Sequence, residues 1–425
     1  MHRRAFSLVF AVLGALLSLQ HGALALRLGL RLPLVTARSR SSSSLVVMSA
    51  LSMASGVSYM TSFPGRPNLP IHYERHGPAG ADDSSDLPIL LLVPGFGVGT
   101  FHWERQFEAL SKKCIVYSMD LLGQGKSWPT SAITSDDNLV YSAELWRDQI
   151  IFFIETIIKR PVHIAGNSLG GYLSVAASSH RPDLVKSLCL LNSAPFWGFA
   201  APKGESRAFP FNIWDGTLPA PDSVLSFGSA YFNILRSRST VQTMLTGVYK
   251  SPKAFDERLV ESIIQSASPP GNKGMEAFTS ILFAPKYERS FDSMLADLKR
   301  PTILLYGAED PWIVPYWGKR AMRNLGTNAA YLSLSPSGHC PHHETPTAVN
   351  AILESWVGLV ESSGTQLLAS GELSKHPQIA SLQGIYHEPL TGDNVSVALQ
   401  DSTPSTISER FFFFFDSVVE AAKPK

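Results

Sequence analysis

The chain has 425 residues, of which 44% are hydrophobic and 17% are charged, and its formal net charge is +1. This composition is typical of a globular protein with a large core, and the length suits a full α/β domain with an insertion. The near-neutral balance excludes the strongly basic footprint of a nucleic-acid-binding protein. Three cysteines are too few for a disulfide framework and favour a reducing compartment.

The first 60 residues contain six arginines and no acidic residue. A basic start is followed by the apolar run Ala5–Leu19 and by small residues at Ala23–Ala25, as in a secretory signal peptide. Residues 26–58 are rich in arginine and serine, which is the composition of a transit peptide. The tandem predicts a targeting leader over residues 1–60 that directs the protein through the secretory route into a complex plastid. The alternative is a secreted protein with a linker.

The folded part begins with two predicted antiparallel strands at residues 57–63 and 71–75. A short apolar run at residues 88–93 predicts a buried strand, which leads into the loop Pro94–Gly99. Glycines let such a loop turn its backbone inward, so that an N–H can stabilise an oxyanion. We predict that Phe96 supplies one such N–H; a plain strand-to-helix turn is the alternative.

A helix is expected at residues 101–110, a strand at 114–119 and a long helix at 144–159. Asp120 directly follows the strand and could be mistaken for a catalytic acid. We favour a structural role instead, in which its carboxylate accepts backbone N–H groups of the following glycine turn.

The most informative stretch is the turn Gly166-Asn167-Ser168-Leu169-Gly170, which joins an apolar strand to a helix. So sharp a reversal puts Ser168 in a strained conformation and demands small neighbours on both sides. The serine hydroxyl is then held out from the end of a sheet, in front of a helix N-terminus that favours negative charge. We predict that Ser168 is a nucleophile and that the N–H of Leu169 is the second oxyanion donor.

After a strand at residues 184–192, regular alternation stops for about a hundred residues, which is too long for a structureless loop. We predict a cap subdomain at residues 194–299, lying over the active site and rich in large apolar side chains. Most of these side chains should pack the cap against the sheet, and some should line an apolar pocket. The predicted substrate contacts are Phe196, Trp197 and Phe199.

Two further strands are predicted at residues 301–306 and 331–334, and each ends in a polar loop. Asp310 follows the first strand and is the expected acid, with Glu309 as its rival. His339 follows the second strand and is the expected base. The order Ser168, Asp310, His339 is the order that the α/β-hydrolase fold uses. The neighbours Cys340, His342 and His343 lack a zinc-site spacing and should support the histidine loop.

Several segments together resemble the pheophytinase family, plastid enzymes of chlorophyll breakdown. The resemblance runs from about residue 88 to residue 360. Its motifs are Pro94–Gly99, Asp120–Gly125, Trp146–Gln149, Gly166–Gly171, Leu191–Phe199, Glu309–Trp312 and Ser337–His342. His343 replaces the acidic residue expected there, which we interpret as a surface change of little consequence. The cap between residues 200 and 268 matches loosely.

The resemblance implies an α/β-hydrolase fold, with a mostly parallel central sheet, helices on both faces and an inserted cap. It implies hydrolysis of the phytyl ester of a chlorophyll-type pigment, with metal-free pheophytin preferred. The partner would be a small lipophilic pigment, with no nucleic acid, no cofactor and no metal. The expected location is a plastid, and peripheral contact with the thylakoid membrane is left open. Alternatives are a chlorophyll dephytylase, another lipophilic carboxylesterase or lipase, and a receptor of low turnover on the same scaffold.

The expected organisation is therefore a leader at 1–60, a core at 61–193 and 300–360, and a cap at 194–299. A helix at residues 345–360 should close the core. Beyond it, residues 361–425 lack a clear period and include five consecutive phenylalanines, Phe411–Phe415, to which we assign no function. We predict that this C-terminal extension is poorly ordered.

Overall fold

A computed structural model describes residues 56–81, 85–198, 212–364, 366–369, 371–404 and 410. Most of the predicted leader, Phe199 and the run Phe411–Phe415 lie outside the described residues. Strand β1, Val57–Phe63, begins before residue 60, so the predicted end of the leader falls inside the folded chain.

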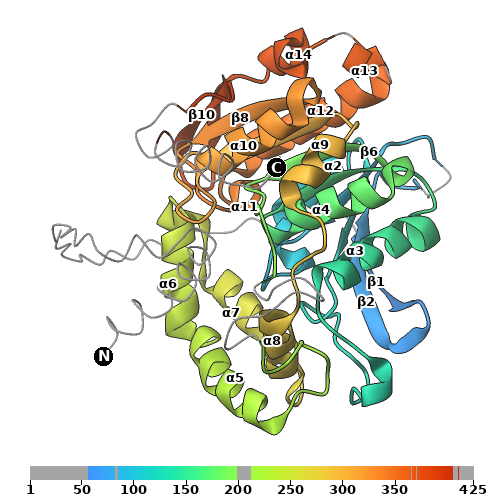
Figure 1. Cartoon of the computed structure of the whole chain (residues 1–425). Helices are drawn as coiled ribbons and strands as arrows, with labels where there is room; N and C mark the ends of the chain where they lie inside the picture. The colour runs from blue at the N-terminus through green and yellow to red at the C-terminus, as the bar shows by residue number, and fades with distance from the viewer. Residues whose placement is uncertain are drawn as a thin grey trace, which may run out of the picture. The chain divides into compact units, whose positions relative to one another are not determined.

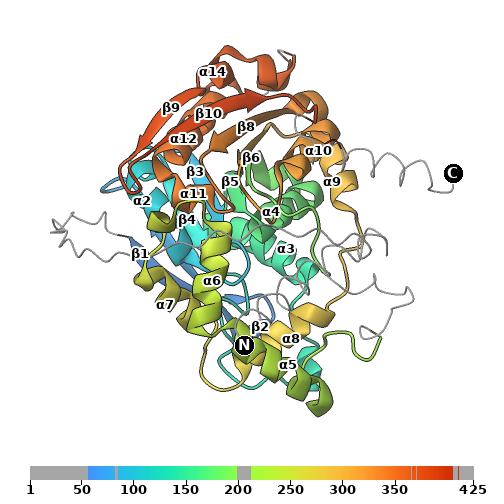
Figure 2. The ribbon, with the colours of Figure 1, turned by 90° about the vertical axis from the view of Figure 1, so that its left-hand side faces the viewer.

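The centre of the fold is a sheet that comprises ten strands in the described part of the chain. Their spatial order is β1-β2-β4-β3-β5-β6-β7-β8-β10-β9, and Figures 1 and 2 show the sheet from two directions. The six central strands are parallel, and the outer strands on both sides pair antiparallel. The strands are β1, β2 (Arg66–His76), β3 (Ile89–Val93), β4 (Ile115–Met119), β5 (Val162–Asn167), β6 (Val185–Leu191), β7 (Thr302–Gly307), β8 (Ala329–Ser335), β9 (Gly384–Glu388) and β10 (Asp393–Gln400).

Helices cover both faces of the sheet, as predicted, because both faces of its central strands are apolar. Along β3, Ile89 and Leu91 belong to the core on one face, and Leu90 and Leu92 belong to the core on the other face. The period of two in side-chain direction thus feeds two separate cores. Helices α3 (Ala143–Phe152), α4 (Leu169–His180), α9 (Phe291–Asp297) and α10 (Pro315–Leu325) contribute to the first core, and α2 (Glu104–Leu110) and α12 (Pro346–Ser363) contribute to the second.

The remaining helical segments are short or belong to the insertion between β6 and β7. They are η2 (Thr100–Trp103), η3 (Ser135–Asp137), η4 (Phe153–Ile158), η5 (Pro182–Leu184), α5 (Asp222–Leu235), α6 (Arg238–Val248), η6 (Pro252–Ala254), α7 (Glu257–Ser266), α8 (Lys273–Phe283), η7 (Gly326–Asn328), α11 (Pro341–Glu344), α13 (Gln366–Ala369), η8 (Leu373–Lys375) and α14 (Pro377–Ala380).

The insertion forms a helical cap, with α5 to α8 grouped together (Figure 1). Helix α9 also lies in the segment predicted as cap, but it packs on the core helices α4 and α10. The ring of Phe291 in α9 stacks on Tyr172 of α4, with 5.4 Å between ring centroids. The structural cap therefore ends before residue 291, earlier than the predicted boundary at 299.

The prediction that residues 361–425 are poorly ordered is wrong for the described part of this extension. Strand β10 pairs antiparallel with β8, and β9 pairs with β10, so the extension adds two strands to the sheet (Figure 2). Val395 and Val397 of β10 are fully buried in the second core. The hairpin is thus part of the fold that supports β8, the strand that leads to His339.

Candidate active site

Ser168 stands at the sharp turn between β5 and α4, in the conformation that the sequence predicts. Its φ of 54° lies in the left-handed region, which is costly for a residue with a side chain. The neighbouring glycines are required by contact: a Cβ on Gly166 would lie 2.4 Å from the carbonyl oxygen of Gly170. A Cβ on Gly170 would lie 2.2 Å from the carbonyl oxygen of Val93. Strain and close packing therefore fix the serine at the end of the sheet.

The loop after β3 packs directly against this turn. A Cβ added to Gly95 would lie 3.5 Å from the Cβ of Ser168. The N–H of Gly97 donates to the side-chain carbonyl of Gln124, which fixes the loop from the other side. Phe96 lies between these two glycines, and Leu169 is the first residue of α4, where backbone N–H groups have no helical acceptor. Leu169 thus follows Ser168 directly, Phe96 follows the glycine that packs against it, and the role of both residues as oxyanion donors stays a prediction.

His339 and Asp310 meet at the ends of neighbouring strands. The Nδ1 atom of His339 lies 2.7 Å from Oδ2 of Asp310, and both side chains are buried. A carboxylate only accepts hydrogen bonds, so Nδ1 carries the proton and Nε2 is free to take one. The side-chain amide of Asn167, the residue before Ser168, donates to the carbonyl oxygen of His339 at 3.0 Å. The histidine loop is therefore tied to the serine turn.

Asn192 is a positioning residue that the sequence analysis missed. Its side-chain Nδ2 donates to Oδ2 of Asp310 at 2.7 Å, and its side-chain Oδ1 accepts the N–H of Gly307 at 3.0 Å. The other oxygen of Asp310 accepts the backbone N–H groups of Trp312 and Ile313. The acid is therefore held from several sides. The available signal was a polar residue directly after the apolar strand β6.

Glu309, the rival acid, has a different role. Its carboxylate accepts from the hydroxyl of Ser335 at 2.7 Å and from the N–H of Ser337 at 2.8 Å. It therefore braces the loop between β8 and His339, while Asp310 is the carboxylate that contacts the imidazole.

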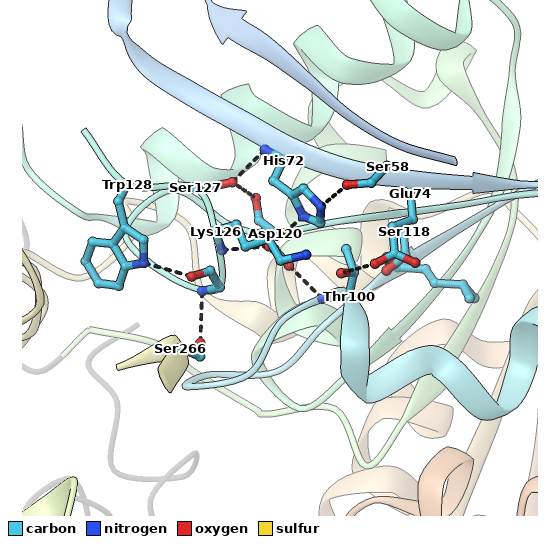
Figure 3. A network of polar contacts seen from close by, with 12 residues as sticks. Ser58, His72, Glu74, Thr100, Ser118, Asp120, Lys126, Ser127, Trp128 and Ser266 are labelled. Carbon is cyan, nitrogen blue, oxygen red and sulfur yellow. Dashed lines mark hydrogen bonds and ion pairs between the residues drawn. The ribbon is translucent and has the colours of Figure 1, made fainter. Parts of the chain in front are cut away.

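Asp120 has the structural role predicted for it. Its carboxylate accepts the N–H groups of Thr100 and Lys126. The second bond fixes the glycine turn that lies between Asp120 and Lys126. It also lies 2.8 Å from Nδ1 of His72, whose other nitrogen is 2.7 Å from the hydroxyl of Ser58 (Figure 3). Asp120 is therefore committed to the β1–β2 side of the sheet rather than to His339.

An open pocket between core and cap lies beside the loop of Phe96. Its empty volume, the part open to solvent included, is about 330 Å³. Phe96 and Trp128 line it from the core, and Phe232, Phe278 and Ile281 line it from the cap. The polar loop of Figure 3 supports one wall, because Trp128 donates to the carbonyl of Gly125 at 2.8 Å. The result is an aromatic pocket next to the proposed oxyanion loop.

Of the predicted substrate contacts, Trp197 lies beside a residue that lines this pocket, but neither Phe196 nor Trp197 is itself among the lining residues. The ring of Trp197 lies beside that of Phe96, with 5.2 Å between centroids, and beside that of Trp146 at 6.3 Å. Phe196 is half-buried. Phe199 lies outside the described residues. The role of all three as substrate contacts stays a prediction.

His343 is buried, so the expectation of a surface change was wrong. Its ring stacks on that of His102, with 5.0 Å between centroids, and His102 also approaches Nε2 of His342 at 3.2 Å. Burial disfavours the imidazolium, so it lowers the pKa of His102 to about 3 and the pKa values of His342 and His343 well below their ordinary range. Among the described residues, no group of three or more His, Cys, Asp or Glu side chains could hold a metal ion.

The chain as a whole resembles known proteins. The sequence matches the Alpha/beta hydrolase family over residues 90–352, which includes Ser168, Asp310 and His339. The chain belongs to this family. The hydrolase is 35% identical to the chloroplastic pheophytinase of Arabidopsis thaliana over 331 residues, which cover 71% of this chain and 67% of that relative. It is a pheophytinase-like carboxylic ester hydrolase.

More distant relatives share the scaffold of this hydrolase. The (lyso)-N-acylphosphatidylethanolamine lipase of Homo sapiens is 26% identical over 289 residues, covering 64% of this chain and 80% of the lipase. The crystal structure of the enol-lactonase from Burkholderia xenovorans aligns with a TM-score of 0.53 at 16% identity, covering 71% of this chain and 100% of that chain. The second likeness shows the shared fold.

Proposed function

We propose that this hydrolase removes the phytyl chain from pheophytin and releases pheophorbide and phytol. The observation that carries the proposal is the 35% identity to a chloroplastic pheophytinase over 71% of the chain. The aromatic side chains of core and cap that gather beside Phe96 support it, because a chlorin ring and an isoprenoid chain are large apolar groups that such a surface can contact.

In the proposed mechanism, the hydroxyl oxygen of Ser168 attacks the ester carbonyl while Nε2 of His339 takes its proton. The N–H groups of Phe96 and Leu169 stabilise the negative charge that develops on the carbonyl oxygen. The ester C–O bond then breaks, and the protonated His339 gives its proton to the departing phytol oxygen. The pheophorbide acyl group remains on Ser168.

In the second half, His339 takes a proton from water, and the resulting hydroxide attacks the acyl-serine carbonyl. The bond to Ser168 breaks, the serine regains its proton from His339, and pheophorbide leaves as the acid. Asp310 keeps Nδ1 protonated throughout and stabilises the imidazolium. These steps need no metal and no cofactor.

The test compares three substrates with the purified protein: pheophytin, chlorophyll and a short p-nitrophenyl ester. The proposal expects pheophorbide from pheophytin at a higher kcat/KM than the dephytylated product from chlorophyll. A preference for chlorophyll would identify a dephytylase of the magnesium pigment. Turnover of the short ester with neither pigment cleaved would favour a carboxylesterase or lipase. Tight pigment binding without any product would favour a receptor.

An acyl-glycerolipid lipase is the second candidate, and the similarity to the human lipase favours it. A lipase would cleave the acyl chain of a phospholipid such as an N-acylphosphatidylethanolamine and leave pheophytin intact. Adding this lipid as a fourth substrate separates the two candidates directly.

We propose that the protein acts in a plastid, as its chloroplastic relative does, and that residues 1–60 direct it there through the secretory route. A fluorescent reporter fused to these residues should accumulate in the plastid, and its secretion into the medium would contradict the proposal. Within the described residues, no helix has the length and apolar character needed to cross a membrane. Contact with the thylakoid surface therefore stays a separate prediction, tested by flotation of the protein with thylakoid-lipid vesicles.

A further inference from the structure

The cap touches the loop of the proposed base through backbone atoms. The N–H of His339 donates to the carbonyl oxygen of Val248, the last residue of α6, at 2.8 Å. Gly338 is packed so closely that an added Cβ would lie 2.1 Å from the same oxygen and 3.0 Å from the nitrogen of Lys250. The end of α6 and the loop of His339 therefore cannot shift independently.

Glu344 joins these two segments with its carboxylate. The side chain is 1% exposed, and it sits at the end of α11, five residues after His339. One carboxylate oxygen accepts the N–H of Gly338 at 2.6 Å. The other oxygen accepts the N–H of Ser251 in the cap. One oxygen thus serves the base loop and the other serves the cap.

The carboxylate is kept in a mixed electrostatic environment. Burial raises the pKa of Glu344 to about 7, and the nearby carboxylate of Glu309 also raises it. Hydrogen bonds from the N–H groups of Ser251, Gly338 and Lys250 lower the pKa of the same carboxyl. Tyr249 and Cys340 are further ionisable neighbours. The ionised carboxylate offers an acceptor to both segments, one on each oxygen, without presenting a donor to either of them. An amide in its place would turn an NH₂ group toward one of the two N–H donors.

We propose that Glu344 is a positioning residue that locks the loop of His339 to the cap segment Val248–Ser251 and thereby aims the imidazole at Ser168. This inference rests on the proposed role of His339 as the base. It makes the placement of the cap a condition for fast chemistry, because the same carboxylate holds both parts.

The chain offers a matched control in Glu388. This carboxylate is also fully buried and also accepts two backbone N–H groups, those of Thr347 and Ala348 at the start of α12. Burial raises its pKa as well. Replacing either glutamate with glutamine therefore disturbs a buried carboxylate that accepts backbone N–H groups, but only Glu344 contacts Gly338, the residue before His339.

The test measures kcat and KM for a p-nitrophenyl ester, and the rate at which a fluorophosphonate labels Ser168, in Glu344→Gln and Glu388→Gln. Because the imidazole is misaimed and the pocket is intact, we expect Glu344→Gln to lose about tenfold or more in kcat and in labelling rate, with KM within about twofold. Glu388→Gln should keep kcat and the labelling rate within about twofold of the wild type, even if its Tm falls as far as that of Glu344→Gln.

A second variant covers the case in which Glu344→Gln does not fold. Gly338→Ala keeps the carboxylate but forces the loop away from Val248, and it should show the same loss in kcat at unchanged KM. If both variants keep the kcat of Glu388→Gln, the inference is overturned while the proposed function stands. If the wild-type protein shows neither Ser168-dependent hydrolysis nor labelling, the proposed function and this inference fall together.

Discussion

Nδ1 of His339 lies 2.7 Å from Oδ2 of Asp310, although the two residues are 29 positions apart in the chain. They meet because β7 and β8 are parallel neighbours whose carboxyl ends lie at the same edge of the sheet. Asp310→Asn should therefore lower kcat by about 10⁴, because an amide can stabilise the wrong tautomer of the imidazole and cannot balance the imidazolium. The turnover of a p-nitrophenyl ester measures this loss, and an unchanged circular dichroism spectrum shows that the variant is folded.

Glu309→Gln is the control for that prediction, since Glu309 precedes Asp310 and bonds to Ser335 and Ser337 instead of the imidazole. Its kcat should fall by less than about tenfold, as expected for a loop brace. A loss in Glu309→Gln equal to that in Asp310→Asn would mean that the acid has been assigned to the wrong carboxylate.

The side chain and the backbone N–H of Phe96 should have separable roles. The ring lines the pocket and packs beside Trp197, whereas the N–H is the proposed oxyanion donor. Phe96→Ala keeps the N–H, so kcat/KM for a short p-nitrophenyl ester should stay within about twofold. The value for pheophytin should fall about tenfold, because the loss of a large apolar contact costs about 1–2 kcal/mol.

Ile385→Ala removes an apolar side chain that is exposed on β9. It is the control for Phe96→Ala and should change kcat/KM for neither the short ester nor pheophytin. Equal losses for both substrates in Phe96→Ala would contradict a pigment-contacting ring and would point to a disturbed oxyanion loop.

The buried histidines predict a loss of stability in acid. Because the folded pKa values of His102, His342 and His343 lie below the ordinary value of 6.5, the unfolded chain takes up protons that the folded chain does not. The stability is complete above about pH 6.5 and is lost as the pH falls toward the folded pKa values, by up to about 1.4 kcal/mol per pH unit for each histidine. Glu344 opposes this: burial raises its folded pKa to about 7, so its contribution falls as the pH rises from about 4.5 to about 7.

Urea unfolding at pH 7.5 and pH 5 measures the balance, and we expect the lower free energy of unfolding at pH 5. In His343→Gln the decrease in the free energy of unfolding from pH 7.5 to pH 5 should be about 2 kcal/mol smaller than in the wild type. The reason is that the unfolded variant lacks one histidine that takes up a proton only after unfolding. His387→Gln replaces an exposed histidine of β9 and should leave the drop unchanged. A drop in His343→Gln as large as in the wild type would refute a neutral, buried His343.

The C-terminal hairpin should contribute directly to stability. Val395→Ala creates a cavity in the second core and should lower the free energy of unfolding by about 2 kcal/mol. Ile385→Ala, on the paired strand but 68% exposed, should stay within about 0.5 kcal/mol of the wild type. If the two variants unfolded at the same urea concentration, the hairpin would not be part of the cooperative core.

The parallel core and the positions of Ser168, Asp310 and His339 could be predicted because each depends on a local pattern. A short apolar run predicts a buried strand, and a polar residue in the loop that follows it lies near the end of the sheet. The left-handed conformation of Ser168 follows in the same way from the glycines around it.

Other features depend on contacts between distant segments, which no local pattern displays. Strand β9 lies at the sheet edge with Ile385 exposed, so its sequence lacks the apolar signal of a core strand. His343 is buried because α11 packs against η2, which brings His102 onto its ring, and because Tyr249 also packs on that ring. Asn192 likewise depends on a distant segment, because it bonds to Gly307 of β7 and to Asp310. Glu344 depends on one too, because it bonds to Ser251 of the cap.

In the proposed mechanism, the hydroxyl oxygen of Ser168 forms a covalent bond with the pigment acyl group. The most direct test incubates pheophytin with the purified wild-type protein and with Ser168→Ala, and measures pheophorbide by chromatography. We expect steady release of pheophorbide by the wild type and none above the no-enzyme rate by Ser168→Ala, with the same Tm for both proteins. Undiminished release by Ser168→Ala would contradict the assignment of Ser168 as the nucleophile.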